Sequence, residues 1–371
     1  MRTGGDRFLT TTDCLRTVPT SAIKQTKNMK LITIIALLAT ASAVFPLTGC
    51  TGDEPYKGAK PSHRDKDDSN IGNTDGSDVE IKKVPTLVNR AGFDIDTIGP
   101  GLIHYVYQGR EPITQANQYV NVLELDLTSN AYKLELAYYF PSDNNPTTAE
   151  AMKEARGIAA TNAGLEPSSI NIRRNGVELW WTKVDPDDEI YGWRHNAAIM
   201  WNDKSDVRIV NARKDFHQCN DFYKECSEKN LISSGPMIID DYKLVGSQIV
   251  NPIYTTDDLK KMDGGTLDSF SGLRHPRTIA ALTEDRDLLL FTFDGRATEA
   301  DGINMAEAAR FISINFNAQY AINMDGGGST TMCIKGQGDP VTNCVNHPTD
   351  NGKFDHDGLR SLTTFFVIVP N

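Results

Sequence analysis

The segment AINMDGGGSTTMCIKG, residues 321–336, places one carboxylate beside three consecutive glycines and three hydroxyl side chains. Asp325 follows an apolar stretch typical of a strand, so it is expected at the end of that strand. Gly326, Gly327 and Gly328 allow positive φ angles and leave no Cβ atom in the way of a ligand. Consecutive amides in such a loop can bind an anion. A tight turn that bonds to Asp325 explains the same residues equally well.

A second candidate cluster is RHPRTIAALTEDRDLLLFTFDGR, residues 274–296, which predicts two strands joined by a polar turn. Arg277 begins the first strand, and Asp294 and Arg296 follow the second. Since the outer ends of an antiparallel hairpin meet, these three side chains are expected at one edge of the sheet. Arginine binds phosphate oxygens in pairs, so the cluster is a candidate phosphate site. A surface ion-pair network is the alternative.

A third segment, VNHPTD at residues 345–350, is followed by Arg360 before the last predicted strand. Taken alone it reads as an ordinary loop. His347 in this segment and His275 in the preceding cluster each stand before a proline. A single histidine in such a place is more often a structural residue than a member of a site.

The elements that must position these residues are mainly strands. The alternating segments at 119–127 and 131–140 predict a pair of strands. INIRRNGVELWW, residues 170–181, predicts a hairpin with Asn175-Gly176 at its turn. Further strands are predicted at residues 196–201, 206–211, 231–239, 277–283, 287–293, 319–324, 329–335 and 362–369.

Two helices are predicted from capping-box spacings. Thr147 with Glu150 opens one, and Asn304 with Glu307 opens another that extends to about Asn317. Strands outnumber helices, and short turns join many of them. The prediction is therefore an α+β fold, with a large mixed, mostly antiparallel twisted sheet and flanking helices in a single domain.

Residues 1–49 have the pattern of an export presequence with a signal peptide. LITIIALLATASAVFPLTGC, residues 31–50, follows three lysines, is largely apolar and ends in a segment resembling a bacterial lipobox. A transmembrane helix is the alternative. We expect Cys50 to be lipidated, residues 50–83 to form a flexible polar tether, and residues 84–371 to form the folded domain. The expected location is a bacterial membrane, the outer membrane being favoured, on either of its faces.

The acidic charge balance restricts the classes of molecule that the protein can bind. Removing residues 1–49, which hold six basic and two acidic side chains, leaves 32 basic and 47 acidic side chains, a net charge of −15. Nucleic acid is therefore excluded as a partner, because neutralising its phosphates requires lysine and arginine. A phosphate site must be local, built from a few arginines or amides against this field. The predicted membrane contact is through the lipid alone.

Four cysteines fall as two local pairs within the expected domain, Cys219 with Cys226 and Cys333 with Cys344. Because exported proteins meet an oxidising compartment, two disulfides are predicted. A zinc site is the alternative, although neither pair has the short spacing usual for zinc ligands.

The motifs together resemble the phosphodiester glycosidase family, which includes N-acetylglucosamine-1-phosphodiester α-N-acetylglucosaminidase and many exported bacterial proteins. RHPRT, FTFDGR, GINMAEAARFI, AINMDGGGSTT and VNHPTD followed by Arg360 occur in the order found in that family. The resemblance covers about residues 119–371. Residues 162–166 read Asn-Ala-Gly-Leu-Glu where the family has Asn-Gly-Gly-Phe-Phe, and residues 360–362 read Arg-Ser-Leu where it has Arg-Pro-Val. One aromatic side chain that could stack on a sugar is thus absent.

The resemblance implies hydrolysis of a sugar-1-phosphodiester at the anomeric C–O bond, which releases a sugar and a phosphate monoester. The phosphate leaves as a stable anion, so one carboxylate on the sugar side and cations on the phosphate side can be enough. Asp325 is the preferred nucleophile or general base, Asp294 is the second candidate, and Glu307 is the third, although capping already explains Glu307. The phosphate-binding candidates are Arg277, Arg296, Arg360, Gly326, Gly327 and Gly328, and the substrate-binding candidates are Asn162, Thr278, Ser329, Thr330 and Asn346.

This mechanism requires no cofactor. A divalent cation held by Asp294, Asp301 or Asp325 is an alternative, although their spacing matches no known calcium loop. Two other functions stay open at this point. One is a glycan-binding surface lipoprotein without turnover, which the changes at residues 163–166 favour. The other is a metal-dependent phosphodiesterase that breaks the P–O bond.

Overall fold

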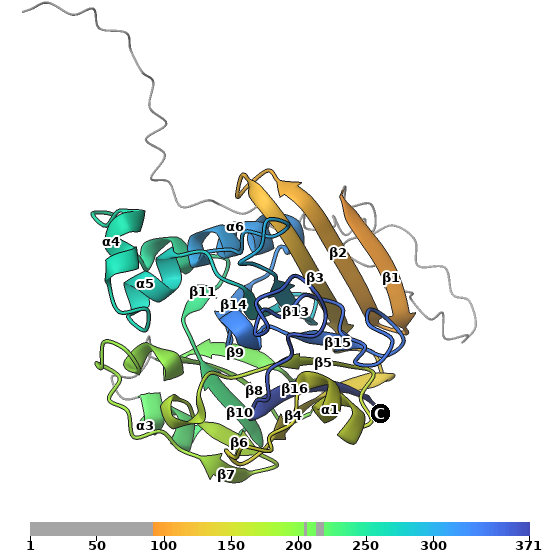
Figure 1. The fold of residues 1–371 in the computed structure, drawn as a ribbon. Coiled ribbons are helices and arrows are strands. Elements are labelled where there is room, and N and C mark those ends of the chain that lie inside the picture. The colour runs from red at the N-terminus through yellow and green to blue at the C-terminus, as the bar shows by residue number, and fades with distance from the viewer. Residues whose placement is uncertain (1–91, 204–205, 213–218) are drawn as a thin grey trace, which may run out of the picture. The chain divides into compact units, whose positions relative to one another are not determined.

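The computed structural model describes residues 92–203, 206–212 and 219–371, and all of them lie in one compact unit (Figure 1). Within these residues the strands form three sheets in which every pairing is antiparallel. The predicted α+β class with mostly antiparallel strands is confirmed. The strands are divided over three sheets, however, where one large sheet was expected.

The largest sheet has seven strands in the order β1-β2-β3-β13-β12-β14-β11. In chain order these are β1 (Phe93–Gly99), β2 (Leu102–Glu111), β3 (Ala116–Asp126), β11 (Met237–Ile239), β12 (Arg277–Leu282), β13 (Asp287–Phe293) and β14 (Tyr320–Asn323). The sequence pattern did not predict β1 or β2. The β12–β13 hairpin is confirmed, and Arg277 stands opposite Phe293 in its register.

The second sheet has the order β7-β6-β10-β8-β9, and the third has the order β15-β5-β16-β4. The second contains β6 (Ile172–Arg174), β7 (Val177–Trp180), β8 (Ala197–Trp201), β9 (Arg208–Asn211) and β10 (Asn230–Ser234). The third contains β4 (Tyr132–Tyr138), β5 (Ala159–Asn162), β15 (Met332–Ile334) and β16 (Thr364–Pro370).

Two sequence predictions about strand pairing were wrong. The strands at 119–127 and 131–140 do not pair with each other, because β3 pairs with β2 and β13 whereas β4 pairs with β16. Local alternation marks a strand but does not name its partner. The stretch 231–239 is two strands in different sheets, since Gly235 and Pro236, joined by a cis peptide bond, separate β10 from β11.

Among the described residues, the helices are short except for one. They are α1 (Thr148–Glu154), α3 (Cys219–Glu225), α4 (Thr256–Lys261), α5 (Leu267–Gly272) and α6 (Met305–Phe316), with single 3₁₀ turns η1 (Pro167–Ser169), η2 (Gly192–His195), η3 (Val245–Gln248) and η4 (Gly327–Ser329). Both predicted capping boxes, Thr147 with Glu150 and Asn304 with Glu307, are present. The predicted Asn175-Gly176 turn is also confirmed, with positive φ at both residues.

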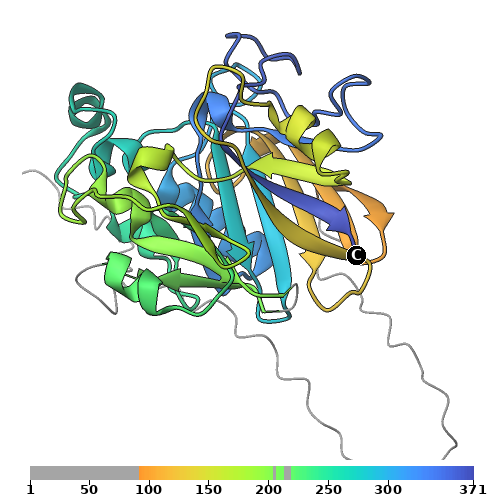
Figure 2. The same ribbon diagram turned by 90° about the horizontal axis from the view of Figure 1, so that it is seen from below.

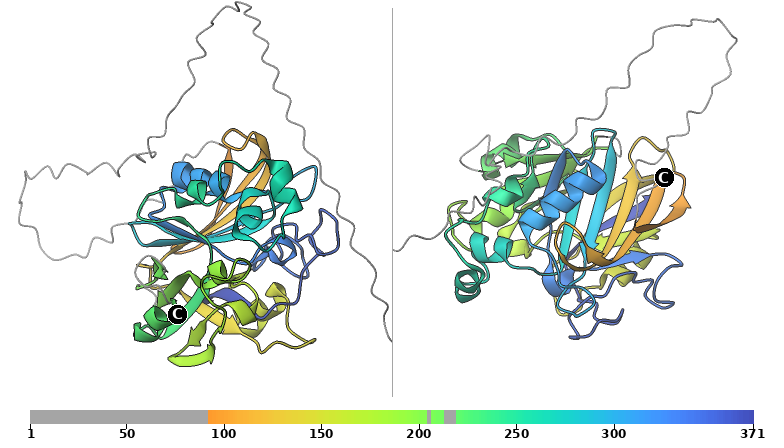
Figure 3. Two further views of the ribbon diagram at one scale, coloured as in Figure 1. Left: turned by 90° about the vertical axis from the view of Figure 1, so that its left-hand side faces the viewer. Right: turned by 90° about the horizontal axis from the view of Figure 1, so that it is seen from above.

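The seven-stranded sheet is buried on both faces. On β12, Ile279 and Ala281 pack with α6, whereas Ala280 and Leu282 pack against residues of the other two sheets. Figures 2 and 3 show α6 across one face of this sheet and the smaller sheets on the other. Strands buried on both sides carry little alternation, and this agrees with the continuous apolar runs at 279–282 and 288–291.

The predicted presequence, lipidated Cys50 and tether lie outside the described residues. Within the ranges that the structure describes, no helix combines the length and apolar character needed to cross a bilayer.

The cysteine prediction needs correction. All four cysteines at 219, 226, 333 and 344 are free thiols in the structure. Cys219 begins the helix at residues 219–225 and Cys226 directly follows it. The two residues are thus about 10 Å apart along the helix axis, which is beyond the Cα separation that a disulfide spans. Cys333 and Cys344 face each other in an antiparallel bridge, so their backbones have a separation that a disulfide could span.

Candidate active site

Asp325 lies directly beyond the end of β14 and is fixed on both sides by its backbone. Its N–H donates to the carbonyl of Ala163 at 2.9 Å, and its carbonyl accepts from Nδ2 of Asn162 at 2.7 Å. Oδ1 of Asn162 also accepts from the Thr278 hydroxyl and the Thr331 N–H. Asn162 and Thr278 are therefore fully buried residues that position Asp325, and sugar binding does not explain their contacts.

The three glycines allow close approach of other groups and do not form an open anion cradle. The Gly326 N–H donates to Oδ1 of Asp325 at 2.8 Å, and the Gly327 N–H donates to Pro276 at 2.8 Å. Both amides are thus engaged. Gly327 has φ +63°, and a Cβ on Gly328 would lie 2.5 Å from Nη2 of Arg360. The glycines therefore admit the backbone of Pro276 and the guanidinium of Arg360.

The Asp325 carboxylate lines a cavity of about 540 Å³. Its walls come from segments far apart in the chain: Gly164, Leu165, Glu166, Pro167, Arg194, Gly264, Gly265, Phe270, Asp325, Ser329, Arg360, Ser361, Leu362 and Thr363. Burial raises the pKa of Asp325, while the hydrogen bonds from Ser329 and Gly326 and the charges of Arg360 and Arg194 oppose that rise. The cavity thus combines one desolvated acid with two arginines, an arrangement typical of catalytic sites.

Arg360 is held at the cavity wall by two partners. Its Nε donates to Oδ2 of Asp350 at 3.0 Å, its Nη2 pairs with Oδ1 of the same residue, and its Nη1 donates to the Ser329 hydroxyl at 3.2 Å. The bidentate pair with Asp350 raises the pKa of Arg360, so this guanidinium stays charged. Of the three predicted phosphate arginines, Arg360 is the one that lines the cavity.

Arg194 is a cavity residue that the sequence did not reveal. Its side chain is 15% exposed, and its Nε is buried with no hydrogen-bond partner among the residues described. Its ion pair to Glu166 is long, at 3.7 Å, and that glutamate side chain is 64% exposed. The guanidinium packs over the ring of Tyr191, 4.7 Å from the centroid. No motif marks Arg194, which lies in the 3₁₀ turn η2.

Phe270 supplies the aromatic wall that the sequence at residues 162–166 lacks. It lies on α5, packs against Trp193 with ring centroids 4.6 Å apart and lines the cavity. Arg277 lies behind this wall, with its Cζ 4.3 Å from the Phe270 centroid. An aromatic face suits the apolar face of a sugar ring. The aromatic side chain is therefore present but comes from another part of the chain.

Arg277 is not placed to hold a phosphate in this cavity. It is fully buried and donates to the carbonyls of Ile303 at 3.3 Å and Leu273 at 3.1 Å, and to that of Phe270. Burial, together with the charge of Arg296, lowers its pKa to about 9. The expected role of Arg277 is corrected to that of a residue which fixes the segment carrying Phe270.

Arg296 adopts φ +62° and lies against Gly327, with Nη2 3.1 Å from the position of a Cβ at that glycine. No hydrogen bond or ion pair joins it to the other described side chains. Burial and the charge of Arg360 lower its pKa. Burial, with the charges of Arg277 and Arg296, lowers the pKa of His275 to about 4, so this imidazole is neutral at pH 7.

Asp294 and Asn346 form a buried network next to the cavity. Oδ1 of Asp294 accepts from Nδ2 of Asn346 at 2.9 Å, and Oδ2 accepts from the backbone N–H of His347 and from its Nδ1. Asn346 also donates to Thr330 and accepts from the Met332 N–H. These contacts occupy both side chains, so the structure supports a positioning role where catalysis and sugar binding were predicted. The network fixes the loop that carries Asp350.

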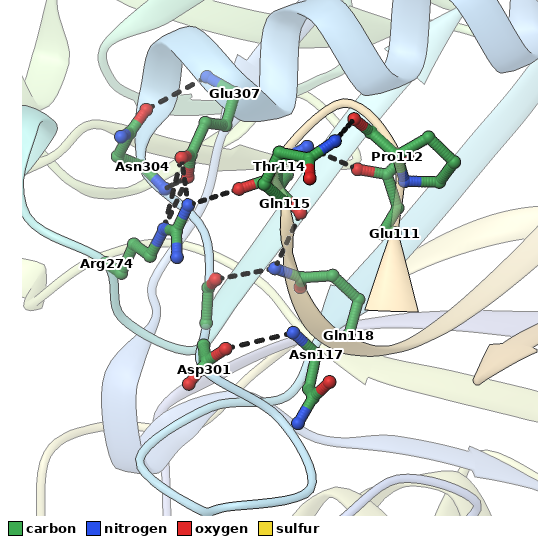
Figure 4. Close-up of polar contacts among 11 residues, drawn as sticks. Glu111, Pro112, Thr114, Gln115, Asn117, Gln118, Arg274, Asp301, Asn304 and Glu307 are labelled. Carbon is green, nitrogen blue, oxygen red and sulfur yellow. Dashed lines mark hydrogen bonds and ion pairs between the residues drawn. The ribbon is translucent and has the colours of Figure 1, made fainter. Parts of the chain in front are cut away.

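Glu307 is likewise structural. Figure 4 shows its carboxylate closing the capping box with Asn304 while it binds Arg274 through two nitrogens. Asp301, a candidate cation ligand, accepts from the Asn117 N–H at 2.9 Å in the same view. Thr330, a predicted sugar ligand, is buried and does not line the cavity. Neither Glu307 nor Asp301 lines the cavity.

In the parts of the chain that the structure describes, no group of three or more His, Cys, Asp or Glu side chains is arranged to hold a metal ion. The aspartates proposed as cation ligands are therefore separate: Asp294 faces His347, Asp301 faces Asn117, and Asp325 faces the cavity.

Comparison with known proteins places this site in a family. A family model described as phosphodiester glycosidase matches residues 157–369. Human N-acetylglucosamine-1-phosphodiester alpha-N-acetylglucosaminidase is 34% identical over 91 residues, which are 24% of this chain and 17% of the human protein. This chain thus aligns with less than a fifth of that relative.

Two solved structures are similar. The catalytic domain of the zebrafish N-acetylglucosamine-1-phosphodiester alpha-N-acetylglucosaminidase, auto-inhibited by its pro-peptide, has a TM-score of 0.49 and 16% identity over 76% of this chain and 85% of that chain. A hypothetical protein from Synechocystis has a TM-score of 0.53 and 10% identity over 76% of this chain and 64% of that chain. The latter alignment shows a shared fold.

A phosphodiester glycosidase is a hydrolase, and the family model of that description spans the residues that line the cavity. Because the matched region covers more than half of the chain and includes Asp325, Arg194 and Arg360, the chain belongs to the phosphodiester glycosidase family, whose members hydrolyse sugar phosphodiesters. The resemblance drawn from the sequence motifs is thereby confirmed.

Proposed function

We propose that the cavity cleaves a sugar-1-phosphodiester at the anomeric C–O bond and releases a sugar and a phosphate monoester. The observation that carries this proposal is the convergence of Asp325, Arg194 and Arg360 on one cavity. The planar guanidinium of arginine binds two oxygens of a phosphate at once. Arg194 has a buried Nε without a partner among the described residues.

In this mechanism Asp325 works in its ionised form on the sugar side. It either takes a proton from the water that attacks the anomeric carbon, or attacks that carbon itself to form a glycosyl ester that water then hydrolyses. The bond from that carbon to the bridging oxygen breaks, and its electron pair leaves with the phosphate. Arg194 and Arg360 stabilise the developing charge, which removes the need for an acid to protonate the leaving group. Phe270 packs on the apolar face of the sugar.

Turnover of a defined sugar-1-phosphodiester tests this proposal. UDP-N-acetylglucosamine is a suitable first substrate, because N-acetylglucosamine is the sugar in the names of the human and zebrafish relatives. Asp325→Asn is expected to lower kcat by about 10³-fold or more, as loss of a catalytic carboxylate does. A near-wild-type rate in a folded Asp325→Asn protein would rule out its catalytic role.

Hydrolysis in oxygen-18 water distinguishes the three functions. Label in the sugar supports anomeric C–O cleavage, and label in the phosphate supports the alternative phosphodiesterase that breaks the P–O bond. No product from the wild-type protein, together with measurable binding of a sugar phosphate, supports the alternative glycan-binding lipoprotein.

We also propose that the protein is exported and anchored to a bacterial membrane through a lipid on Cys50. The support is the apolar run at residues 31–46 followed by Leu-Thr-Gly-Cys. Metabolic labelling with an alkyne fatty acid is expected to mark the wild-type protein and not a Cys50→Ala variant. Equal labelling of both proteins, or label in neither, would contradict the anchor.

A further inference from the structure

A second cavity, of about 570 Å³, lies between two sheets and shares none of its lining residues with the candidate active site. One wall is β4, the edge strand of the four-stranded sheet, and the other is the β6–β7 hairpin with the ends of β8 and β10. Figure 1 shows β4 beside this hairpin. Its lining is Lys133, Leu134, Glu135, Leu136, Arg174, Asn175, Trp201, Asn202, Asp203, Asn230 and Asn371.

The polar groups of this cavity include the guanidinium of Arg174, which no contact within the described part of the fold holds in place. Arg174 is half-buried, and its backbone pairs with Val177 of β7. No hydrogen bond or ion pair joins its guanidinium to the other described residues. Lys133 and Glu135, by contrast, pair with each other at 2.9 Å. Asn175 and Asp203 are exposed beside Arg174. Guanidinium, amide and carboxylate groups together supply the donors and acceptors that a polyhydroxyl ligand requires.

Aromatic side chains continue the same strand edge. Phe140, two residues beyond the end of β4, is 70% exposed. Its ring lies 6.1 Å from that of Trp180 on β7 and 6.2 Å from that of Tyr138 on β4, edge-on to both. A large exposed aromatic side chain held by two others marks an interaction surface.

This surface leads toward the candidate active site. The segment from residue 133 in β4 to residue 140, just after this strand, spans about 23 Å at the usual rise of a strand. At the far end, the Tyr139 N–H donates to the carbonyl of Thr363, which lines the active-site cavity. The second cavity, Phe140 and the active-site cavity thus follow one another along a single strand.

We propose that the second cavity and the Phe140 surface bind an extended glycan chain along the edge of β4. The chain's hydroxyls bond to Arg174, Asn175 and Asp203, and its sugar faces pack on Phe140 and Trp180. If the proposed function holds, this chain is the glycan part of a long phosphodiester substrate, but glycan binding at this site does not depend on that reaction.

Affinity electrophoresis through gels that contain yeast mannan, dextran, xylan or polygalacturonate tests binding directly. The Asp325→Asn protein is used throughout, so that catalysis plays no part. At least one polysaccharide is expected to retard it, and Phe140→Ala and Arg174→Gln added singly should each weaken that binding at least fivefold. Ile253→Ala, which removes another exposed apolar side chain (72% exposed), is the matched control and should leave it unchanged.

Circular dichroism of each variant confirms that it is folded. No retardation by any of the four polysaccharides would overturn the proposal. So would retardation that Phe140→Ala and Arg174→Gln leave intact, or that Ile253→Ala weakens equally. Because none of these outcomes depends on turnover, a failed glycan site and a failed catalytic assignment are distinguishable.

Discussion

At the scale of single residues, the neighbours of a side chain decide its role more than its motif does. Arg277, Asp294 and Arg296 belong to one recognisable motif set, but the first is bonded to carbonyls and the second to Asn346 and His347. Arg194 belongs to no motif, but it lines the same cavity as Asp325, and its charge acts on that carboxylate. The sequence therefore predicted Asp325 and Arg360 as site residues but could not reveal Arg194 or Phe270, which only the fold brings to them.

The fall of activity at acidic pH should follow the protonation of the Asp325 carboxylate. Since burial raises its pKa above the ordinary value of 3.8, the working carboxylate is lost at a higher pH than for an exposed aspartate. We expect kcat to fall as the pH drops through this raised pKa. A profile of initial rates from pH 3 to pH 8 measures it. A rate that stays constant down to pH 3 would contradict an ionised Asp325 in the reaction.

The same shift predicts a change in stability. The folded state binds a proton at Asp325 more readily than the unfolded state does. The fold therefore loses stability as the pH rises from 3.8 to the raised pKa, and the loss is complete above that pKa. The Asp325→Asn variant should therefore have a higher Tm than the wild type at pH 7. The difference should shrink as the pH falls from the folded pKa toward 3.8. Differential scanning calorimetry at several pH values measures this difference in Tm. A lower Tm for Asp325→Asn than for the wild type at pH 7 would show that the ionised carboxylate does not destabilise the fold.

Arg194→Ala, compared with Arg296→Ala, tests whether lining the cavity or belonging to a sequence motif identifies the phosphate-binding arginine. Loss of a group that stabilises developing charge typically lowers kcat about 10²–10³-fold, so we expect this loss in kcat/KM for UDP-N-acetylglucosamine. Arg296→Ala is the matched control, because Arg296 does not line the cavity, and a change below tenfold is expected. Equal losses in both variants would mean that the cavity lining does not identify the phosphate ligands.

At the scale of elements, the sequence predicts helix starts and turns correctly but does not predict the long-range pairing of β3 and β4. The capping boxes at Thr147 and Asn304 and the Asn175-Gly176 turn are short-range chemistry that lies wholly within a few residues. The partner of β4, by contrast, is β16, more than two hundred residues later. Alternation of polar and apolar residues identifies a strand but not its partner. This is why the predicted pairing of β3 with β4 was wrong.

The two capping boxes offer a test of Glu307. Glu307→Gln removes the charge that binds Arg274 and caps α6, whereas Glu150→Gln in α1 removes a capping charge that no arginine binds. Glutamine at this position keeps the capping-box hydrogen bond, and loss of the charge near a helix N-terminus costs about 0.3–1 kcal/mol. Because Glu307 also loses its ion pair with Arg274, we expect the free energy of unfolding in urea to fall more for Glu307→Gln than for Glu150→Gln. The kcat of Glu307→Gln should stay within about twofold of the wild type. A loss of kcat without a loss of stability would restore the catalytic role.

At the scale of the whole molecule, the cavity is assembled from all three sheets. Asp325 follows β14 of the seven-stranded sheet, Arg194 precedes β8 of the five-stranded sheet, and Thr363 precedes β16 of the four-stranded sheet. No one sheet can form the cavity by itself, and this explains why no single segment of the sequence has a complete catalytic pattern.

The lining of the cavity also predicts which part of the chain is sufficient for activity. Every lining residue lies between Gly164 and Thr363, and the predicted folded domain spans residues 84–371. A protein consisting of residues 84–371 should therefore match one beginning at Cys50 in kcat/KM and in Tm, since residues 50–83 are predicted to form a flexible tether. Steady-state kinetics and calorimetry on the two proteins measure this. A lower Tm or a tenfold lower kcat/KM for the shorter protein would show that residues 50–83 contribute to the fold or the site, and would move the boundary of the domain toward Cys50.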